Sequence, residues 1–267
     1  MSEEHVSGSM RTQGRGAGVV AVIDANYRSR WFRRYPGRPS RVRLVCLPHA
    51  GGTATLFHGW AERLPHDVEM LAVQYPGRQE RFAEPCIEDM AELATRITEA
   101  LEPELAGPLV LFGHSLGAAV AYEVARRIEA RHGSVPRRVL VSGRGAPHTE
   151  RGGALHLLDD ERLIASARRL GDLGSSAYDN PDLRPLLLPS LRGDYRLIER
   201  YRPGHPAPLR APVTALGGDR DPGCAVAALE SWAELTTSEF ECQVFAGGHF
   251  YLVPAENELV EFVSRYL

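Results

Sequence analysis

Cysteine is scarce in this 267-residue chain, and the four cysteines follow no metal-binding or redox pattern. No CxxC pair occurs, and no cysteine is paired with a histidine as in a metal site. The sequence therefore gives no sign of a disulfide framework. We interpret the four residues as reduced, mostly buried thiols of a cytoplasmic protein: Cys46, Cys86, Cys224 and Cys242.

Long apolar runs and a strong net charge are absent as well. No run reaches the length of a membrane span, and the first forty residues lack the apolar core of a signal peptide. The 31 Lys and Arg nearly balance the 34 Asp and Glu, so the formal net charge is -3. We expect no membrane and no nucleic acid among the partners. Neither G-x-G-x-x-G nor G-x-x-x-x-G-K-[ST] occurs, which argues against nucleotide binding.

The composition, with 43% hydrophobic and 24% charged residues, suits one large domain or a core with a subdomain. Residues 1–40 are rich in Gly, Ser and Arg, and we expect them to form a disordered lead. Within this lead, Trp31 and Phe32 are suited to pack back on the body. The folded domain is then expected over residues 41–267.

Short apolar runs alternate with helical patterns through most of the chain. This alternation predicts an α/β fold, with a mainly parallel sheet flanked by helices on both faces. Ligands of such sheets bind at the carboxyl ends of the strands. The predicted strands cover residues 42–47, 68–73, 109–112, 138–142, 213–216 and 240–245, and the predicted helices cover 55–64, 89–104, 118–127, a stretch around Trp232, and 255–266.

The segment from about 149 to 206 carries no strand signal. Charged helical stretches alternate there with leucine-rich ones, and Pro181, Pro185 and Pro189 are expected to break them up. We interpret the segment as a helical lid insertion. The alternative is a subdomain with a small core of its own.

The motif that organises the chain is Gly-His-Ser-Leu-Gly at residues 113–117. A predicted strand precedes it and a predicted helix follows, which is the context of a nucleophile elbow. Glycines let the strand and the helix approach each other, and the helix N-terminus favours developing negative charge. Ser115 is therefore our candidate nucleophile. A glycine-rich turn without catalytic function is the alternative, because the bare motif is common.

Ser115 needs a general base, and His249 is the best candidate. It stands after the last predicted strand, within Gly247-Gly248-His249, so it lies at the same edge of the sheet. His114 is next to Ser115 and should point the other way in a sharp turn. His49 lies in a glycine-rich turn and could line the site without acting as the base.

The base in turn needs a carboxylate to fix its tautomer. Asp219 and Asp221 both follow the penultimate predicted strand, in a turn that Gly, Asp and Pro would favour in any case. We prefer Asp221, the third residue after Gly218, and keep Asp219 as the alternative. The order Ser, Asp, His along the chain is the order of an α/β-hydrolase.

An oxyanion hole requires two backbone N–H donors. Leu116, directly after the candidate nucleophile, should supply one of them. The turn after the first predicted strand should supply the other, and Ala50 is the expected donor there. Gly51 and Gly52 would let the backbone approach the substrate.

Taken together, these motifs resemble those of type II (external, editing) thioesterases, stand-alone enzymes of the α/β-hydrolase superfamily. The resemblance covers roughly residues 31–267, and the lead before about residue 28 has no clear counterpart. It rests on residues 44–52, on 74–78 with Arg81, Glu84 and Pro85, and on 113–117, 191–195, 218–222 and 247–250, with Gly193 where Ala is more usual.

The resemblance implies hydrolysis of stalled or misprimed acyl groups from the phosphopantetheine arm of an acyl or peptidyl carrier protein, through an acyl-serine intermediate. Such enzymes edit polyketide and nonribosomal peptide biosynthesis of antibiotics. The resemblance implies no metal and no organic cofactor, and we expect a monomer. A carboxylester or lactone hydrolase on the same fold is the alternative.

Two further expectations concern substrate and partner. The lid should cover Ser115 and form an apolar acyl chamber, lined by residues drawn from Leu186, Leu187, Leu188 and Leu191. Basic residues should steer an acidic carrier protein, and the candidates for this docking patch are Arg78, Arg81, Arg192 and Arg196.

Overall fold

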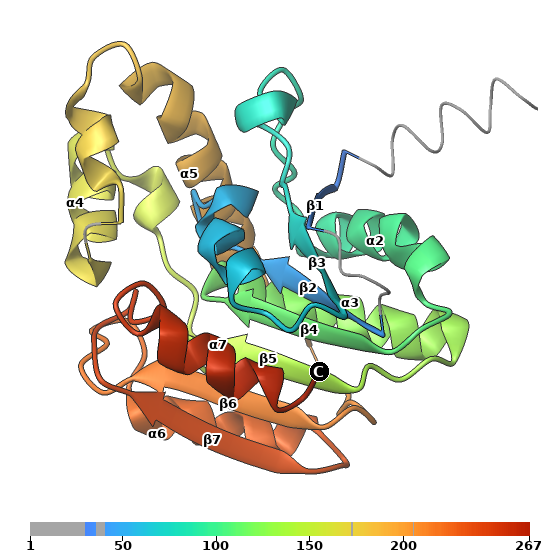
Figure 1. Cartoon of the computed structure of the whole chain (residues 1–267). Coiled ribbons are helices and arrows are strands. Elements are labelled where there is room, and N and C mark those ends of the chain that lie inside the picture. Colours follow the sequence, from blue (N-terminus) through green and yellow to red (C-terminus); the bar gives the residue numbers. More distant parts are fainter. Residues whose placement is uncertain (1–29, 36–40, 172, 205) are drawn as a thin grey trace, which may run out of the picture.

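The computed structural model describes residues 30–35, 41–171, 173–204 and 206–267 (Figure 1). Its centre is a seven-stranded sheet in the order β1-β3-β2-β4-β5-β6-β7. Strand β1 pairs with β3 in antiparallel fashion, and all the other pairs are parallel. The strands are β1 Phe32–Tyr35, β2 Val42–Leu47, β3 Val68–Val73, β4 Leu109–His114, β5 Arg138–Ser142, β6 Val213–Gly218 and β7 Phe240–Phe245.

The helices alternate with the strands as predicted. Helix α2 begins after Asp89, whose side chain accepts the Glu92 N–H at 2.8 Å and so caps the helix. The α-helices are α2 Met90–Leu101, α3 Leu116–His132, α4 Asp160–Leu170, α5 Arg184–Arg200, α6 Val226–Glu230 and α7 Glu256–Ser264. The 3-10 helices are η1 Ala54–Glu62, η2 Gln79–Arg81, η3 Glu102–Glu104, η4 Leu155–Leu157, η5 Ser175–Asp179 and η6 Ser231–Leu235.

Each strand contributes to two cores because successive side chains point to opposite faces of the sheet. In β2, Val45 and Leu47 pack in the larger cluster with α2 and α3, whereas Leu44 and Cys46 pack in the second cluster with η1 and α7. Figure 1 shows α2 and α3 on one side of the sheet and α7 on the other. The predicted α/β fold, a mainly parallel sheet covered on both faces, is therefore confirmed.

The sheet includes residues that precede position 41, the predicted start of the domain. Trp31 and Phe32 are buried, and β1 pairs along β3 from Phe32 opposite Val73 to Tyr35 opposite Met70. Part of the expected disordered lead is thus an edge strand. The domain therefore starts before residue 41, at β1 or earlier in the chain. The rest of that lead, residues 1–29 and 36–40, lies outside the described residues.

The described residues of the segment 149–206 form only helical elements, as expected. The prolines, however, do not break it up in the way we predicted. Helix α5 runs from Arg184 through Pro185 and Pro189. Pro185 lies in the first turn, where backbone N–H groups have no helical partner, and Pro189 removes only one helical hydrogen bond. Figure 1 shows α4 and α5 beyond the carboxyl ends of the parallel strands.

Across the residues that the structure describes, no helix is both long enough and apolar enough to cross a bilayer.

Candidate active site

Ser115 stands at a strained turn between β4 and α3. Its φ of 56° lies in a region that few residues other than glycine adopt, and its N–H donates to the Ser142 carbonyl at 2.7 Å. A Cβ on Gly113 would collide with the backbone of Gly117, and a Cβ on Gly117 would collide with the Leu47 carbonyl. Glycine at both positions therefore lets α3 start directly against the sheet. The serine is left partly exposed at the helix N-terminus.

His249 and Asp221 form a buried pair. The His249 Nδ1–H donates to Asp221 Oδ2 at 2.8 Å, and the two side chains are only 3% and 0% exposed. Asp221 is itself held by the Gly223 N–H at 2.7 Å. The buried His249 Nε2 has no hydrogen-bond partner among the described residues. This arrangement fixes the tautomer of the imidazole and leaves a lone pair on Nε2.

The rival residues have other partners. Asp219 accepts the Gly247 N–H at 2.7 Å and so braces the turn before His249 without touching its ring. His114 Nδ1 is hydrogen-bonded to Ser142 Oγ at 2.9 Å, and burial holds the pKa of His114 well below its usual value. Burial, together with nearby His249 and Arg78, lowers the pKa of His49 to about 3. These two histidines are therefore neutral near pH 7.

Ser115 and His249 line one cavity of about 130 Å³, together with Ala50 and Leu116. The sites predicted after β2, β4 and β7 thus meet at the carboxyl edge of the sheet, as the topology requires. The helical insertion supplies much of the remaining wall: Ala167 and Leu170 from α4, and Leu191, Tyr195 and Ile198 from α5.

The four leucines predicted to line the acyl chamber lie in different environments in the structure. Only Leu191 lines the cavity. Leu188 is buried against α4 in a small cluster with Leu163 and Ile164, so the insertion also has the core of its own that we held as an alternative. Leu187 is half-buried and Leu186 is 45% exposed, and neither lines the cavity. A single helix cannot turn three consecutive side chains to the same face.

Arg144 is a charged cavity residue that the motifs in the sequence did not identify. Arg144 lines the cavity beside Glu150, with which it forms an ion pair at 3.2 Å. Its Nε atom is buried without a partner in the described part of the chain, and burial lowers the pKa of Arg144. Arg144 stands two residues after the end of β5, so the rule that places ligands at strand ends could have identified it.

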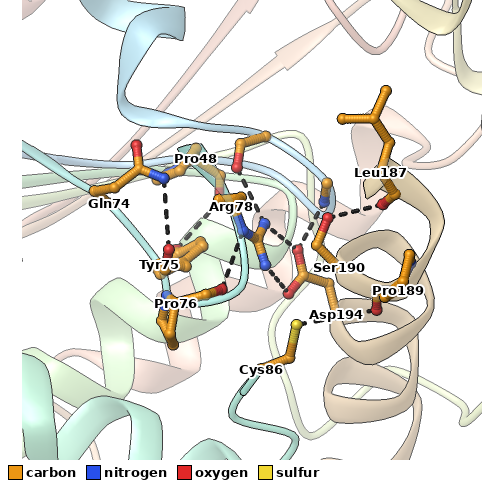
Figure 2. A network of polar contacts seen from close by, with 12 residues as sticks. Pro48, Gln74, Tyr75, Pro76, Arg78, Cys86, Leu187, Pro189, Ser190 and Asp194 are labelled. Atoms are coloured by element: carbon orange, nitrogen blue, oxygen red, sulfur yellow. Dashed lines mark hydrogen bonds and ion pairs between the residues drawn. The ribbon is translucent and has the colours of Figure 1, made fainter. Parts of the chain in front are cut away.

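The turn at residues 48–52, which we call the oxyanion turn, is tied to α5. Asp194 Oδ2 accepts the Gly51 N–H at 2.7 Å. Arg78, in the loop after β3, forms two hydrogen bonds with the same carboxylate and donates to the Gly52 carbonyl at 3.1 Å. Figure 2 shows the Arg78 guanidinium directly facing the Asp194 carboxylate, with dashed lines joining the two side chains.

This arrangement contradicts the docking expectation for two of the four arginines. Arg78 and Arg81 are 4% and 3% exposed, so neither can meet a partner protein. Arg81 pairs with Glu84 and lies over the Trp31 ring. Arg192 and Arg196 are partly exposed, and each is held in an ion pair, with Asp160 and Glu88 respectively. The charge pattern was visible in the sequence, but the burial was not.

No group of three or more His, Cys, Asp or Glu side chains suited to a metal ion occurs in the described ranges.

Known proteins share the fold and much of the sequence of this chain. The family described as thioesterase domain matches residues 42–267. Thioesterase PikA5 of Streptomyces venezuelae is 45% identical over 239 residues, which are 89% of this chain and 85% of that protein. A probable cadicidin biosynthesis thioesterase of Streptomyces griseus is 44% identical over 225 residues, which are 84% of this chain and 62% of the longer relative.

Among solved structures, the type II thioesterase BorB from the borrelidin biosynthetic cluster superposes with a TM-score of 0.82 at 41% identity. The match covers 89% of this chain and 97% of BorB. The chain therefore belongs to the thioesterase family and, with its α/β-hydrolase fold, is a type II thioesterase of polyketide and nonribosomal peptide pathways.

Proposed function

We propose that this thioesterase hydrolyses short acyl thioesters held on the phosphopantetheine arm of acyl or peptidyl carrier proteins. The observation that carries the proposal is the meeting of Ser115 and His249 at one cavity. His249 is paired with Asp221 on one side, and its Nε2 is without a hydrogen-bond partner in the described chain. This is the arrangement that a serine nucleophile and its general base require.

In the first half-reaction, Ser115 Oγ attacks the thioester carbonyl while its proton passes to His249 Nε2. Asp221 stabilises the resulting imidazolium and keeps the ring in place. The tetrahedral oxyanion accepts hydrogen bonds from the Ala50 and Leu116 N–H groups, each of which is worth about 3 to 4 kcal/mol in a preorganised hole. The C–S bond then breaks, and His249 returns the proton to the leaving thiolate.

In the second half-reaction, water attacks the acyl-serine ester. His249 takes a proton from the water and gives it to Ser115 Oγ as the ester bond breaks. The products are a free carboxylic acid, the carrier protein with its thiol restored, and the original enzyme.

The size and lining of the cavity support short acyl groups as substrates. Its volume of about 130 Å³ is well below the roughly 300 to 1,000 Å³ of sites for drug-sized ligands. Its apolar wall comes largely from α4 and α5, which is why we propose that the insertion over residues 149–206 acts as a lid. Removal of stalled or misprimed short chains fits such a site.

The carrier protein, the monomeric state and the cytoplasmic setting belong to the same proposal. Arg196 is 31% exposed on α5 and remains a candidate for docking an acidic carrier. Arg192 donates to the His156 and Leu158 carbonyls within the insertion, which favours a structural function for it. Size-exclusion chromatography with light scattering would test the monomer.

The central test compares acyl-carrier-protein thioesters with matched oxygen esters. Ser115→Ala should abolish turnover while the fold remains intact, and His249→Ala should be nearly as severe, since the members of a triad act as a unit. His148→Ala, at an exposed histidine paired with Glu234, is the matched control and should keep full activity. More than a few per cent of activity in Ser115→Ala would exclude the serine mechanism. Faster turnover of oxygen esters would favour the ester hydrolase.

A further inference from the structure

Arg78 and Asp194 form a buried ion pair between segments far apart in the sequence. Arg78 Nη1 lies 2.6 Å from Asp194 Oδ2, and Arg78 Nη2 lies 2.8 Å from Oδ1. Their side chains are 4% and 5% exposed. Removing two charges from water is costly, and a buried ion pair is often no more stabilising than apolar residues of the same size. A pair of this kind therefore calls for an explanation beyond stability.

The pair also contacts the oxyanion turn on both sides of the peptide that joins Gly51 and Gly52. Asp194 accepts the Gly51 N–H at 2.7 Å, and Arg78 donates to the Gly52 carbonyl at 3.1 Å. Arg78 is itself anchored by a hydrogen bond from Nε to the Pro76 carbonyl at 3.4 Å. The pair therefore holds a donor and an acceptor on successive residues of the turn, directly after Ala50.

Gly51 needs such an external support. Its φ is +74°, and glycine populates both signs of φ with similar ease, so its own conformational preference does not fix the peptide between Ala50 and Gly51. Helix α5 presses on the same residue, because a Cβ on Gly51 would lie 2.9 Å from Leu191 Cδ1. Asp194 and Leu191 both belong to α5, so the orientation of the turn depends on the position of this helix.

We infer that Arg78 and Asp194 are positioning residues that orient the oxyanion turn, and with it the Ala50 N–H, when α5 is seated on the turn. The inference rests on the proposed function, in which Ala50 donates to the oxyanion. By this inference, the oxyanion hole is complete only when α5 of the insertion packs against the oxyanion turn. The pair acts through the backbone of the turn and does not touch the acyl group.

The test uses the full chain and two probes, an acyl-N-acetylcysteamine substrate and an alkylboronic acid that forms a tetrahedral adduct with the serine. Asp194→Asn and Arg78→Lys should each lower kcat about 10- to 100-fold with a change in KM below about threefold, because the hole acts on the transition state. The inhibition constant of the boronic acid should rise by a similar factor. The double variant should be little worse than either single variant, since both substitutions release the same turn.

Glu88→Gln is the matched control. It removes another ion pair between α5 and the body, Arg196 with Glu88, that does not contact the oxyanion turn. Its kcat and boronic acid affinity should change less than about twofold. If Asp194→Asn fails to fold, Arg78→Lys carries the test alone, because it keeps the buried positive charge and loses the fixed geometry with which Arg78 holds Asp194, Gly52 and Pro76 together.

Two results would overturn the inference. One is an unchanged boronic acid affinity in Asp194→Asn and Arg78→Lys, which would make the pair a purely structural clamp. The other is an equal loss in Glu88→Gln, which would mean that any contact of α5 with the body has the same effect. Boronic acid binding needs Ser115 and the hole but no thioester turnover, so it remains measurable even if the proposed thioester substrate is wrong.

Discussion

Two aspartates, Asp219 and Asp221, follow β6, and they differ in their hydrogen-bond partners. Asp221 accepts a hydrogen bond from the His249 ring, whereas Asp219 accepts one from the Gly247 N–H. The first contact sets the tautomer of the imidazole, and the second only shapes the turn that carries it. At the scale of single residues, this difference of one side-chain partner separates the two carboxylates chemically.

We expect Asp221→Asn to lower kcat about 10³- to 10⁴-fold, because the amide would favour the wrong histidine tautomer. Asp219→Asn should cost less than about tenfold, since its remaining carbonyl can still accept the Gly247 N–H. Steady-state hydrolysis of an acyl-N-acetylcysteamine thioester measures both. A larger loss in Asp219→Asn would assign the function of orienting His249 to that residue instead.

Among the helices, α5 combines three tasks on successive turns. Leu188 packs inside the insertion, Leu191 reaches the cavity and Gly51, and Asp194 binds the oxyanion turn. Residues three apart lie on neighbouring parts of one helix face, so a single α5 can join the insertion to the site. The apolar wall of the cavity is completed by α4, which contributes Ala167 and Leu170.

The proposed acyl wall leads to a prediction on α4. Ala167→Phe places a bulky ring at a residue that lines the cavity and should shift the preference toward shorter acyl chains by at least about tenfold in kcat/KM, within the few kcal/mol that methylene-sized differences in a pocket can supply. Leu186→Phe, on the exposed side of α5, should leave the preference unchanged. The measurement is a series of acyl thioesters that differ by one methylene. Equal profiles for Ala167→Phe and the wild type would place the acyl chamber elsewhere.

At the scale of the whole molecule, the packing around the site also constrains stability. His49 and His114 are neutral in the folded protein because burial lowers their pKa values. In the unfolded chain both would have an ordinary pKa near 6.5. The unfolded state therefore binds more protons than the folded state below about pH 6.5, and stability must fall as the pH drops through this range.

His49 gives the clearest test, since its pKa of about 3 implies a loss of about 1 to 2 kcal/mol between pH 7.5 and pH 5. Urea denaturation at the two pH values measures the change, and His49→Gln should reduce it by that amount. The neighbours His249 and Arg78 would oppose a positive charge on His49 and so act in the same direction. An unchanged slope in His49→Gln would contradict a neutral folded-state His49.

Local sequence patterns were enough to predict several strands and the turns that carry the site. Alternating and continuous apolar runs predicted β2, β3, β5 and β7 with the bounds that the structure has. The elbow at 113–117 and the turns that carry His249 and the two aspartates were also readable, because glycines and strand ends are local signals. Parallel topology then brought these turns to one edge of the sheet.

Contacts between residues far apart in the chain could not be predicted in this way, because they form only on packing. The tertiary structure paired His249 with Asp221, turned Leu191 inward while Leu186 stayed exposed, and buried Arg78 against Asp194, 116 residues away. Arginine in the sequence looks the same whether it faces solvent or a buried carboxylate. The difference lies in desolvation and in the partner across the gap, and both arise only when the segments pack together.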